Sequence, residues 1–270
     1  MSGIDLRIGR LFGAKKNLVI SALDHVMEYG AQKGIEDSRE AISRCGHTDA
    51  LLLSRFMLEK NWKLFSGKRS PLPIVRLNWS SGFYYPLQYR KGYTVIATEV
   101  EEAVRAGAHA VICSLFLENE DEKMETDNVG VFSEVVRQKE ALGVPLIGEC
   151  YVVEHEEKTA DQVHEKVMRV TRVMAELGAD LIKCFFTGSR FPEIVENTPV
   201  PIFTIGAEKL NTDREVLQKA HASVQGGARG IIFGRNIFMA QNPPLLIAAL
   251  NDVINNNVEP IQAAAKHGLE

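Results

Sequence analysis

The 270-residue sequence lacks the features of several protein classes. Its four cysteines are scattered, without a CxxC pair or a Cys/His metal spacing, so a metal site is not expected and the thiols should be reduced core residues. No apolar run approaches the roughly 20 residues that span a bilayer, and the N-terminus has no signal-peptide core. A net charge of −4 gives no reason to expect nucleic acid or an anionic membrane as partner. The sequence therefore predicts a cytoplasmic protein with no cofactor.

What the sequence does contain is eight apolar, β-rich runs with helical patterns between them. The clearest helical pattern covers 163–177, and several helical patterns end at a glycine, as at Gly107, Gly178 and Gly227. Near-continuous apolar strands joined by helices indicate a parallel sheet covered on both faces. Eight such units in this length predict a closed (β/α)8 TIM barrel. The predicted strands are 18–24, 50–54, 74–79, 110–117, 145–153, 179–186, 201–205 and 230–233.

An open, doubly wound α/β sheet is the alternative architecture. It usually has fewer strands and a glycine-rich dinucleotide turn after the first one, and residues 23–26 (Leu-Asp-His-Val) do not form such a turn. Residues 4–12 resemble a short helix that would close the bottom of the barrel. Since no linker or low-complexity tract interrupts the chain, we expect one domain over residues 1–270.

Lys183 is the most informative residue, because it lies inside the apolar run of the sixth predicted strand. A lysine is seldom buried without a reason, and burial disfavours its ammonium form. A neutral amine is a nucleophile that can form a Schiff base with a carbonyl compound. The alternative is a structural lysine that pairs with a carboxylate inside the barrel. Its position near the carboxyl end of a central strand favours catalysis.

Other candidates lie at the carboxyl ends of the first and fifth strands. Glu149 and Tyr151 are two residues apart and should face the same way, beside Lys183, where they could transfer protons. Glu149 could instead only neutralise Lys183. Asp24 and His25 suit proton transfer or binding of substrate hydroxyls, although His25 could simply bond a loop carbonyl.

The loops after the last two strands often bind phosphate in such barrels. Here they offer Gly206 and Gly234-Arg235, and Arg235 would add a charged contact to the anion. Residues 237–241 are expected to form the short helix of this site, ended by Asn242 and two prolines. Arg55, Arg76 and Arg190 are candidate anchors for a second anionic group.

Together these residues resemble the archaeal-type class I fructose-bisphosphate aldolases of the DeoC/LacD-like family, which includes aminodideoxyheptulosonate synthases and autoinducer-2 phosphate thiolases. The resemblance covers nearly the whole chain. Residues 18–25, ending in Asp24-His25, resemble the first strand of the family, and residues 178–188 closely match its Schiff-base strand. Residues 230–238, with Gly234-Arg235, resemble its phosphate loop.

The resemblance implies an imine on Lys183, an acid/base role for Tyr151 and contact of Asp24 with a substrate hydroxyl. It also implies phosphate binding by Gly206, Gly234 and Arg235, and a homo-oligomer. The chain departs from the family pattern at Glu149, where an aromatic residue is common, which favours a substrate other than fructose 1,6-bisphosphate.

The function predicted is a metal-independent lyase that cleaves or forms a C–C bond of a phosphorylated keto sugar. A thiolase- or transaldol-type transferase and a non-catalytic sugar-phosphate-binding barrel are the alternatives.

Overall fold

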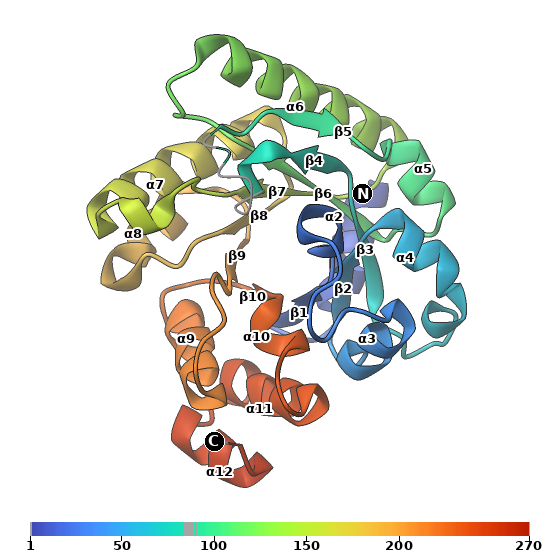
Figure 1. Ribbon diagram of the computed structural model, residues 1–270, viewed down its shortest axis with the longest axis vertical. Coiled ribbons are helices and arrows are strands. Elements are labelled where there is room, and N and C mark those ends of the chain that lie inside the picture. Colours follow the sequence, from blue (N-terminus) through green and yellow to red (C-terminus); the bar gives the residue numbers. More distant parts are fainter. Residues whose placement is uncertain (1, 84–88, 90, 270) are drawn as a thin grey trace.

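The computed structural model describes residues 2–83, 89 and 91–269. Eight parallel strands form a closed barrel in the order β1-β10-β9-β8-β7-β6-β3-β2 (Figure 1). Every barrel strand overlaps one of the predicted runs, so the prediction of a (β/α)8 TIM barrel is confirmed. The barrel strands are β1 (Leu18–Ala22), β2 (Ala50–Leu53), β3 (Leu72–Arg76), β6 (Ala110–Leu115), β7 (Leu146–Cys150), β8 (Leu181–Cys184), β9 (Ile202–Ile205) and β10 (Gly230–Phe233).

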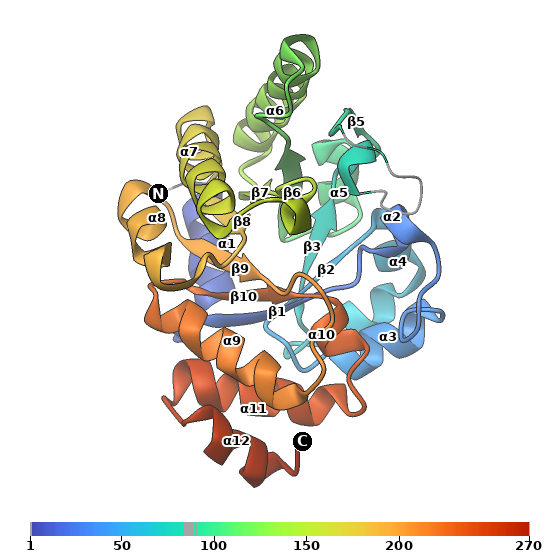
Figure 2. The ribbon, with the colours of Figure 1, turned by 60° about the vertical axis from the view of Figure 1, so that its left-hand side comes forward.

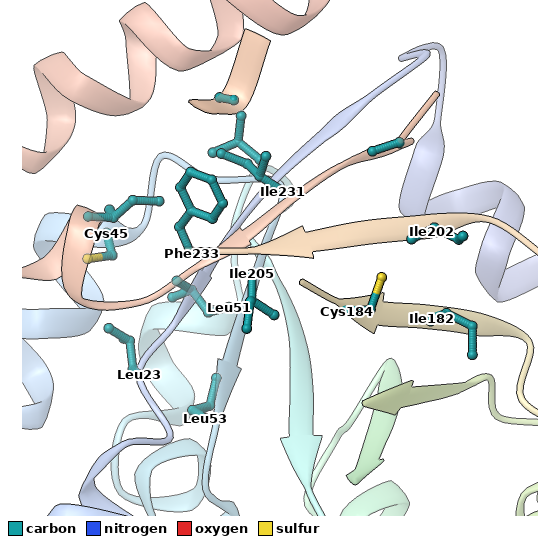
Figure 3. Packing of buried hydrophobic residues seen from close by; sticks show 14 of the residues in the cluster. Leu23, Cys45, Leu51, Leu53, Ile182, Cys184, Ile202, Ile205, Ile231 and Phe233 are labelled. Atoms are coloured by element: carbon teal, nitrogen blue, oxygen red, sulfur yellow. The ribbon is translucent and has the colours of Figure 1, made fainter. Parts of the chain in front are cut away.

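Alternate residues along each strand face the barrel interior or the surrounding helices. Ile20, Leu52 and Ile74 belong to the interior cluster, whereas Val19, Leu51 and Val75 belong to the larger cluster that includes helix residues. Both faces of each strand are therefore apolar, which explains the near-continuous hydrophobic runs. Figure 3 shows part of the outer cluster, with Cys45 and Cys184 among its members. All four cysteines are free and buried, as predicted.

The helices form an outer layer around the barrel (Figures 1 and 2). The helix predicted at 163–177 is α7, which begins with a capping box at Thr159 and ends at Gly178 in the left-handed conformation. In the described part of the chain no helix is long and apolar enough to cross a bilayer. The helices are α1 (Gly3–Phe12), α2 (Val26–Tyr29), α3 (Ser38–Cys45), α4 (Arg55–Lys60), α5 (Val100–Arg105), α6 (Glu122–Leu142), α7 (Ala160–Leu177), α8 (Phe191–Asn197), α9 (Asp213–Gln225), α10 (Arg235–Phe238), α11 (Pro243–Asn255) and α12 (Pro260–His267).

The N-terminal helix α1 closes the end of the barrel at which the strands begin. Leu11 and Phe12 pack against the interior cluster, and the Phe12 ring stacks on Phe203 with centroids 6.1 Å apart. Arg7 ties the helix to the loop after α6 by a 2.6 Å hydrogen bond to the Gly143 carbonyl. The predicted position of this helix is therefore confirmed.

Two local predictions were wrong. Strand β3 ends at Arg76, and Asn78 belongs instead to a small antiparallel hairpin of β4 (Asn78–Ser80) and β5 (Thr94–Ile96). Leu77 makes the transition, because its carbonyl accepts hydrogen bonds from Ala97 and Thr98. Helix α10 begins at Arg235, two residues earlier than expected. Asn242 does not end it but caps α11, its side chain accepting from the Leu245 N–H.

Candidate active site

A pocket opens where the barrel strands end, and its wall contains all eight predicted site residues. They are Lys183, Tyr151, Asp24, Glu149, His25, Gly206, Gly234 and Arg235. Arg76 and Glu28 also line the pocket. A larger and more open hollow lies at the opposite end of the barrel, beside α1, and contains none of these residues. In TIM barrels chemistry takes place at the carboxyl ends of the strands, so the smaller pocket is the candidate active site.

Lys183 lies at the bottom of this pocket and forms an ion pair with Glu149. The two residues are direct partners in the register of β8 and β7, and the Lys183 Nζ is 2.5 Å from the Glu149 Oε1. Both are buried, Lys183 being 6% exposed. The pairing that the sequence left as an alternative is therefore present, and it is located inside the predicted catalytic pocket.

Arg76 connects Glu149 to Asp24. Its Nε donates to the Asp24 Oδ2 at 2.8 Å, and its Nη1 donates to the Glu149 Oε2 at 2.6 Å. Its Nη1 also donates to the Ser114 hydroxyl, which in turn donates to Glu149. Arg76 was a candidate anchor for an anionic substrate, but the structure shows its guanidinium bonded to two protein carboxylates.

The charges of this cluster stabilise one another. Burial by itself would raise the pKa of Glu149, but the Arg76 guanidinium and the Lys183 ammonium lower it well below its usual range. Burial would lower the pKa of Arg76, and Glu149 and Asp24 instead raise it. Arg76 and Glu149 therefore remain charged across the physiological pH range.

The arginine, serine, glutamate and lysine of this cluster occupy one layer of the barrel interior. Ile74, Ile112, Ile147 and Leu181 form the apolar layer two residues earlier on the same four strands. Because side chains two apart on a strand share a face, the next interior positions on β3, β6, β7 and β8 are Arg76, Ser114, Glu149 and Lys183. Sequence reasoning missed Ser114, although this spacing from Ile112 was the signal that could have found it.

His25 is a neutral side chain at the pocket wall. Burial lowers its pKa to about 4, with further lowering by Lys183 and Arg235, although Asp24 opposes the shift. Its Nδ1 is 3.7 Å from an Asp24 oxygen, and its ring packs edge-on against Phe238. Gly234 lets the ring approach, because a Cβ at position 234 would lie 2.2 Å from the His25 Cε1.

The two predicted phosphate loops lie side by side and are joined by Asn236. Its side-chain amide donates to the carbonyls of Gly206, at 3.1 Å, and Glu208, at 2.9 Å, and its Oδ1 accepts from the Leu210 N–H. Arg235 donates to the Ala207 carbonyl at 2.8 Å, and its buried Nε has no partner in the described part of the protein. Arg235 lines the pocket, and contact with an anion remains a prediction for it.

Arg55 and Arg190, the other two candidate anion anchors, lie outside the pocket. Arg55 pairs with Glu102 at 2.6 Å, and Arg190 pairs with Glu165 and Glu193, each at 2.9 Å. Both guanidinium groups are engaged by carboxylates of the helical layer. The structure therefore gives neither arginine a role in binding substrate.

Tyr151 forms an aromatic wall near the pocket mouth. Its ring contacts Phe83 and Phe185, with centroids 5.2 and 5.3 Å apart. The Nε2 of the neighbouring His155 is 2.7 Å from the Glu208 Oε1, and this hydrogen bond connects the loop after β7 to the loop after β9. His155, Glu156 and Glu208 are the one group in the described residues whose ligand atoms could reach a metal ion, but both carboxylates are exposed.

Glu28 is a pocket residue that sequence reasoning did not select. It lies on α2, one helical turn after Asp24, and is 8% exposed. Burial and the nearby Asp24 raise its pKa to about 8. Its spacing of four residues from Asp24 was the available signal, because residues four apart share a helix face.

Comparison with known proteins agrees with this geometry. A family model described as DeoC/LacD family aldolase matches residues 18–240. An uncharacterized aldolase of Saccharolobus solfataricus is 30% identical over 264 residues, which cover 96% of this chain and 97% of that protein. A 3-hydroxy-5-phosphonooxypentane-2,4-dione thiolase of Photorhabdus laumondii is 28% identical over 258 residues, which cover 94% of this chain and 83% of that protein.

Solved structures support the same fold. An archaeal fructose-1,6-bisphosphate aldolase, whose catalytic lysine is covalently bound to a carbinolamine intermediate, superposes with a TM-score of 0.79. It shares 22% identity, over 93% of this chain and 99% of that one. A fructose-bisphosphate aldolase from Slackia heliotrinireducens gives a TM-score of 0.81 at 16% identity, over 98% of this chain and 90% of that one.

Proposed function

Because this chain belongs to the DeoC/LacD aldolase family, we propose that it is a class I aldolase that acts on a phosphorylated keto sugar through an imine on Lys183. The observation that carries the proposal is the buried Lys183 amine at the bottom of a pocket, with a carboxylate 2.5 Å away. Such an amine can attack a carbonyl carbon once it has lost a proton. The reaction requires no metal ion.

The first steps form the imine. Lys183 passes a proton to Glu149 for the time of the attack, and this transfer is uphill because Arg76 and Lys183 hold the pKa of Glu149 below its usual range. The Lys183 Nζ then attacks the carbonyl carbon while Tyr151 gives its proton to the carbonyl oxygen. The Tyr151 phenolate takes a proton back from the attached nitrogen, which leaves a neutral carbinolamine. Glu149 returns its proton to the carbinolamine hydroxyl, which leaves as water and gives the iminium ion.

Cleavage follows from the iminium ion. Asp24 removes the proton of the substrate hydroxyl that becomes the aldehyde oxygen, and the electrons of the broken C–C bond move to the iminium nitrogen. The product is an enamine on Lys183, which Tyr151 protonates at carbon to give an iminium ion again. Water hydrolyses this iminium ion, which releases the second product and the Lys183 ammonium, and the proton held by Asp24 returns to Tyr151. Arg76 supports both ends of this process, since it orients Asp24 and Glu149 together.

The phosphate group would bind at the loops after β9 and β10. Gly206, Gly234 and Arg235 line the pocket at these loops, and the Arg235 guanidinium supplies a positive charge for the anion. His25, being neutral, would contact a substrate oxygen without adding charge. A single domain over residues 1–270, a homo-oligomer and a cytoplasmic location remain predictions.

A thiolase-type transferase is the second candidate, because a thiolase is among the relatives that align over most of the chain. Dependence of turnover on coenzyme A would favour it over the lyase. A barrel that only binds sugar phosphates is the remaining alternative, and tight binding without any imine would favour that reading.

Borohydride trapping tests the proposal. The protein is incubated with dihydroxyacetone phosphate, ketose phosphates or aldehydes, reduced, and analysed by intact and peptide mass spectrometry. We expect a stable adduct on Lys183 in the wild type and in Lys139→Met, which lacks a different buried lysine. No adduct is expected in Lys183→Met. Absence of an adduct with every compound, in folded wild-type protein, would contradict the imine mechanism.

A further inference from the structure

Glu28 faces the same pocket as the proposed catalytic groups but is not bonded to any of them. Its carboxyl lies near Asp24 after β1, Arg76 on β3, Glu149 on β7 and Lys183 on β8. Strand β4 also packs against α2, and it carries no ionisable side chain. Within the described residues, no hydrogen bond or ion pair engages the Glu28 side chain.

The donors of the buried cations are directed to other carboxylates. Arg76 donates to Asp24, Glu149 and Ser114, and Lys183 pairs with Glu149. Two buried cations therefore balance two buried carboxylates, and Glu28 is a third carboxyl without a cation of its own. Arg235, the remaining cation of the wall, donates to the Ala207 carbonyl.

A third buried negative charge would be repelled by Asp24 and Glu149 and would lack hydration. Burial, together with the charge of Asp24, accordingly raises the pKa of Glu28 to about 8. At neutral pH the side chain is then a carboxylic acid, with one O–H donor and a carbonyl acceptor. Neither group has a partner in the described protein, so both are available to a bound molecule.

We propose that Glu28 is a substrate-binding residue that contacts an oxygen of the substrate as a neutral carboxylic acid, and that its ionisation weakens the binding of anionic substrates. This inference rests on the proposed function, because it assumes a phosphorylated substrate in the pocket. The neutral acid can donate to a hydroxyl or carbonyl oxygen without repelling the phosphate. The carboxylate loses the donor and adds a negative charge close to the substrate.

The test compares wild type with Glu28→Gln, which remains neutral at every pH. Dihydroxyacetone phosphate is the probe, and the concentration for half-maximal trapping on Lys183 is measured from about pH 6 to about pH 9.5. The half-maximal concentration of the wild type is divided by that of the variant at each pH, so that the titration of dihydroxyacetone phosphate itself cancels. We expect the ratio to be constant below about pH 7 and to rise by about three- to tenfold by about pH 9.

A ratio that stays flat over the whole range would overturn the proposal. So would a folded Glu28→Gln protein that forms no adduct at neutral pH, because a neutral amide should replace a neutral acid as a contact. In Glu28→Ala, which removes the contact, the half-maximal concentration should rise about fivefold at neutral pH while the maximal adduct is kept. An unchanged value in that variant would also contradict the proposal.

A second measurement does not depend on the chemistry or on any variant. Carbon-13 labelling of glutamate carboxyls in the wild type should show one carboxyl that titrates near pH 8, with a shift on addition of dihydroxyacetone phosphate. If no carboxyl titrates above about pH 6.5, Glu28 is ionised at neutral pH and the proposal is wrong. If the carboxyl titrates as expected but no Lys183 adduct forms, the proposed function fails and the protonation of Glu28 stands.

Discussion

Lys183 and Lys139, two of the three lysines that are buried in the described part of the protein, have similar burial but very different surroundings. Lys183 is 6% exposed and Lys139 is 1% exposed, and each forms an ion pair with a carboxylate. Both pairs involve the same strand at different ends, since Lys183 lies near the carboxyl end of β8 and Asp180, the partner of Lys139, directly precedes its start. Burial alone therefore does not distinguish the lysine proposed as the nucleophile from one that only pairs with carboxylates.

The surroundings of the two amines make the distinction. The Lys139 Nζ bonds both oxygens of Asp180, at 2.9 and 3.0 Å, and an oxygen of Glu140 at 2.7 Å. Asp180 also accepts the Leu146 N–H, so the cluster joins α6 to the starts of β7 and β8. Lys183 has one carboxylate partner among the described residues and opens onto the pocket. Its remaining N–H groups are available for chemistry.

Removing the Lys183 amine should have the largest effect. In Lys183→Met we expect turnover of the ketose phosphate identified by trapping to fall by at least about a thousandfold, because no imine can form. Lys183→Arg should be equally inactive, since it keeps the charge without the nucleophile. Turnover within tenfold of the wild type in either variant would show that Lys183 is not the nucleophile.

Removing the Lys139 amine should lower the stability of the protein and leave the chemistry at Lys183 intact. Lys139→Met removes a buried ammonium and leaves the partly buried Asp180 without its cation, so we expect the free energy of unfolding to fall by about 3 kcal/mol. Trapping on Lys183 should persist, because Asp180 and Lys183 are at opposite ends of β8. Urea unfolding measures the loss, and Lys139→Arg is the matched control that keeps the charge. A Lys139→Met protein that is as stable as the wild type but forms no adduct on Lys183 would show that the two lysines do not have the separate roles described here.

Glu28 extends the comparison to a carboxyl that lacks a cation. Its pKa, about 8, is higher than the usual unfolded value, so the native state holds a proton that the unfolded chain loses. The stability due to this group is complete below the unfolded pKa and is lost as pH rises to about 8. Relative to wild type, Glu28→Gln should therefore gain about 2 kcal/mol of unfolding free energy between about pH 6.5 and about pH 9. Thermal or urea unfolding at both pH values measures it, and a pH-independent difference would contradict the shift.

The sequence predicted the barrel well, because its signals are local. Apolar runs mark the strands, and position in this fold then places Lys183, Tyr151 and Glu149 at the pocket. The hydrogen bonds of Arg76 and Asn236 could not be predicted in the same way, because they depend on which loops meet in space. The β4–β5 hairpin was missed because Leu77 and Trp79 continue the apolar pattern of β3 past its end at Arg76. The strand ends there because Asn78 pairs with Ile96, which is far away in the sequence.

The contact between His155 and Glu208 at the pocket rim should contribute least to the free energy of unfolding, because it is exposed to solvent. Their contact, 2.7 Å, is as short as those of the buried pairs, but the Glu208 side chain is 57% exposed. Water and salt screen such a pair, so Glu208→Gln should change the free energy of unfolding by no more than about 0.5 kcal/mol. Urea unfolding at low and high salt tests this, with Lys139→Met as the buried reference. A loss close to that of Lys139→Met would mean that the rim contact holds the two loops together, and that exposure is a poor guide to the strength of an ion pair in this protein.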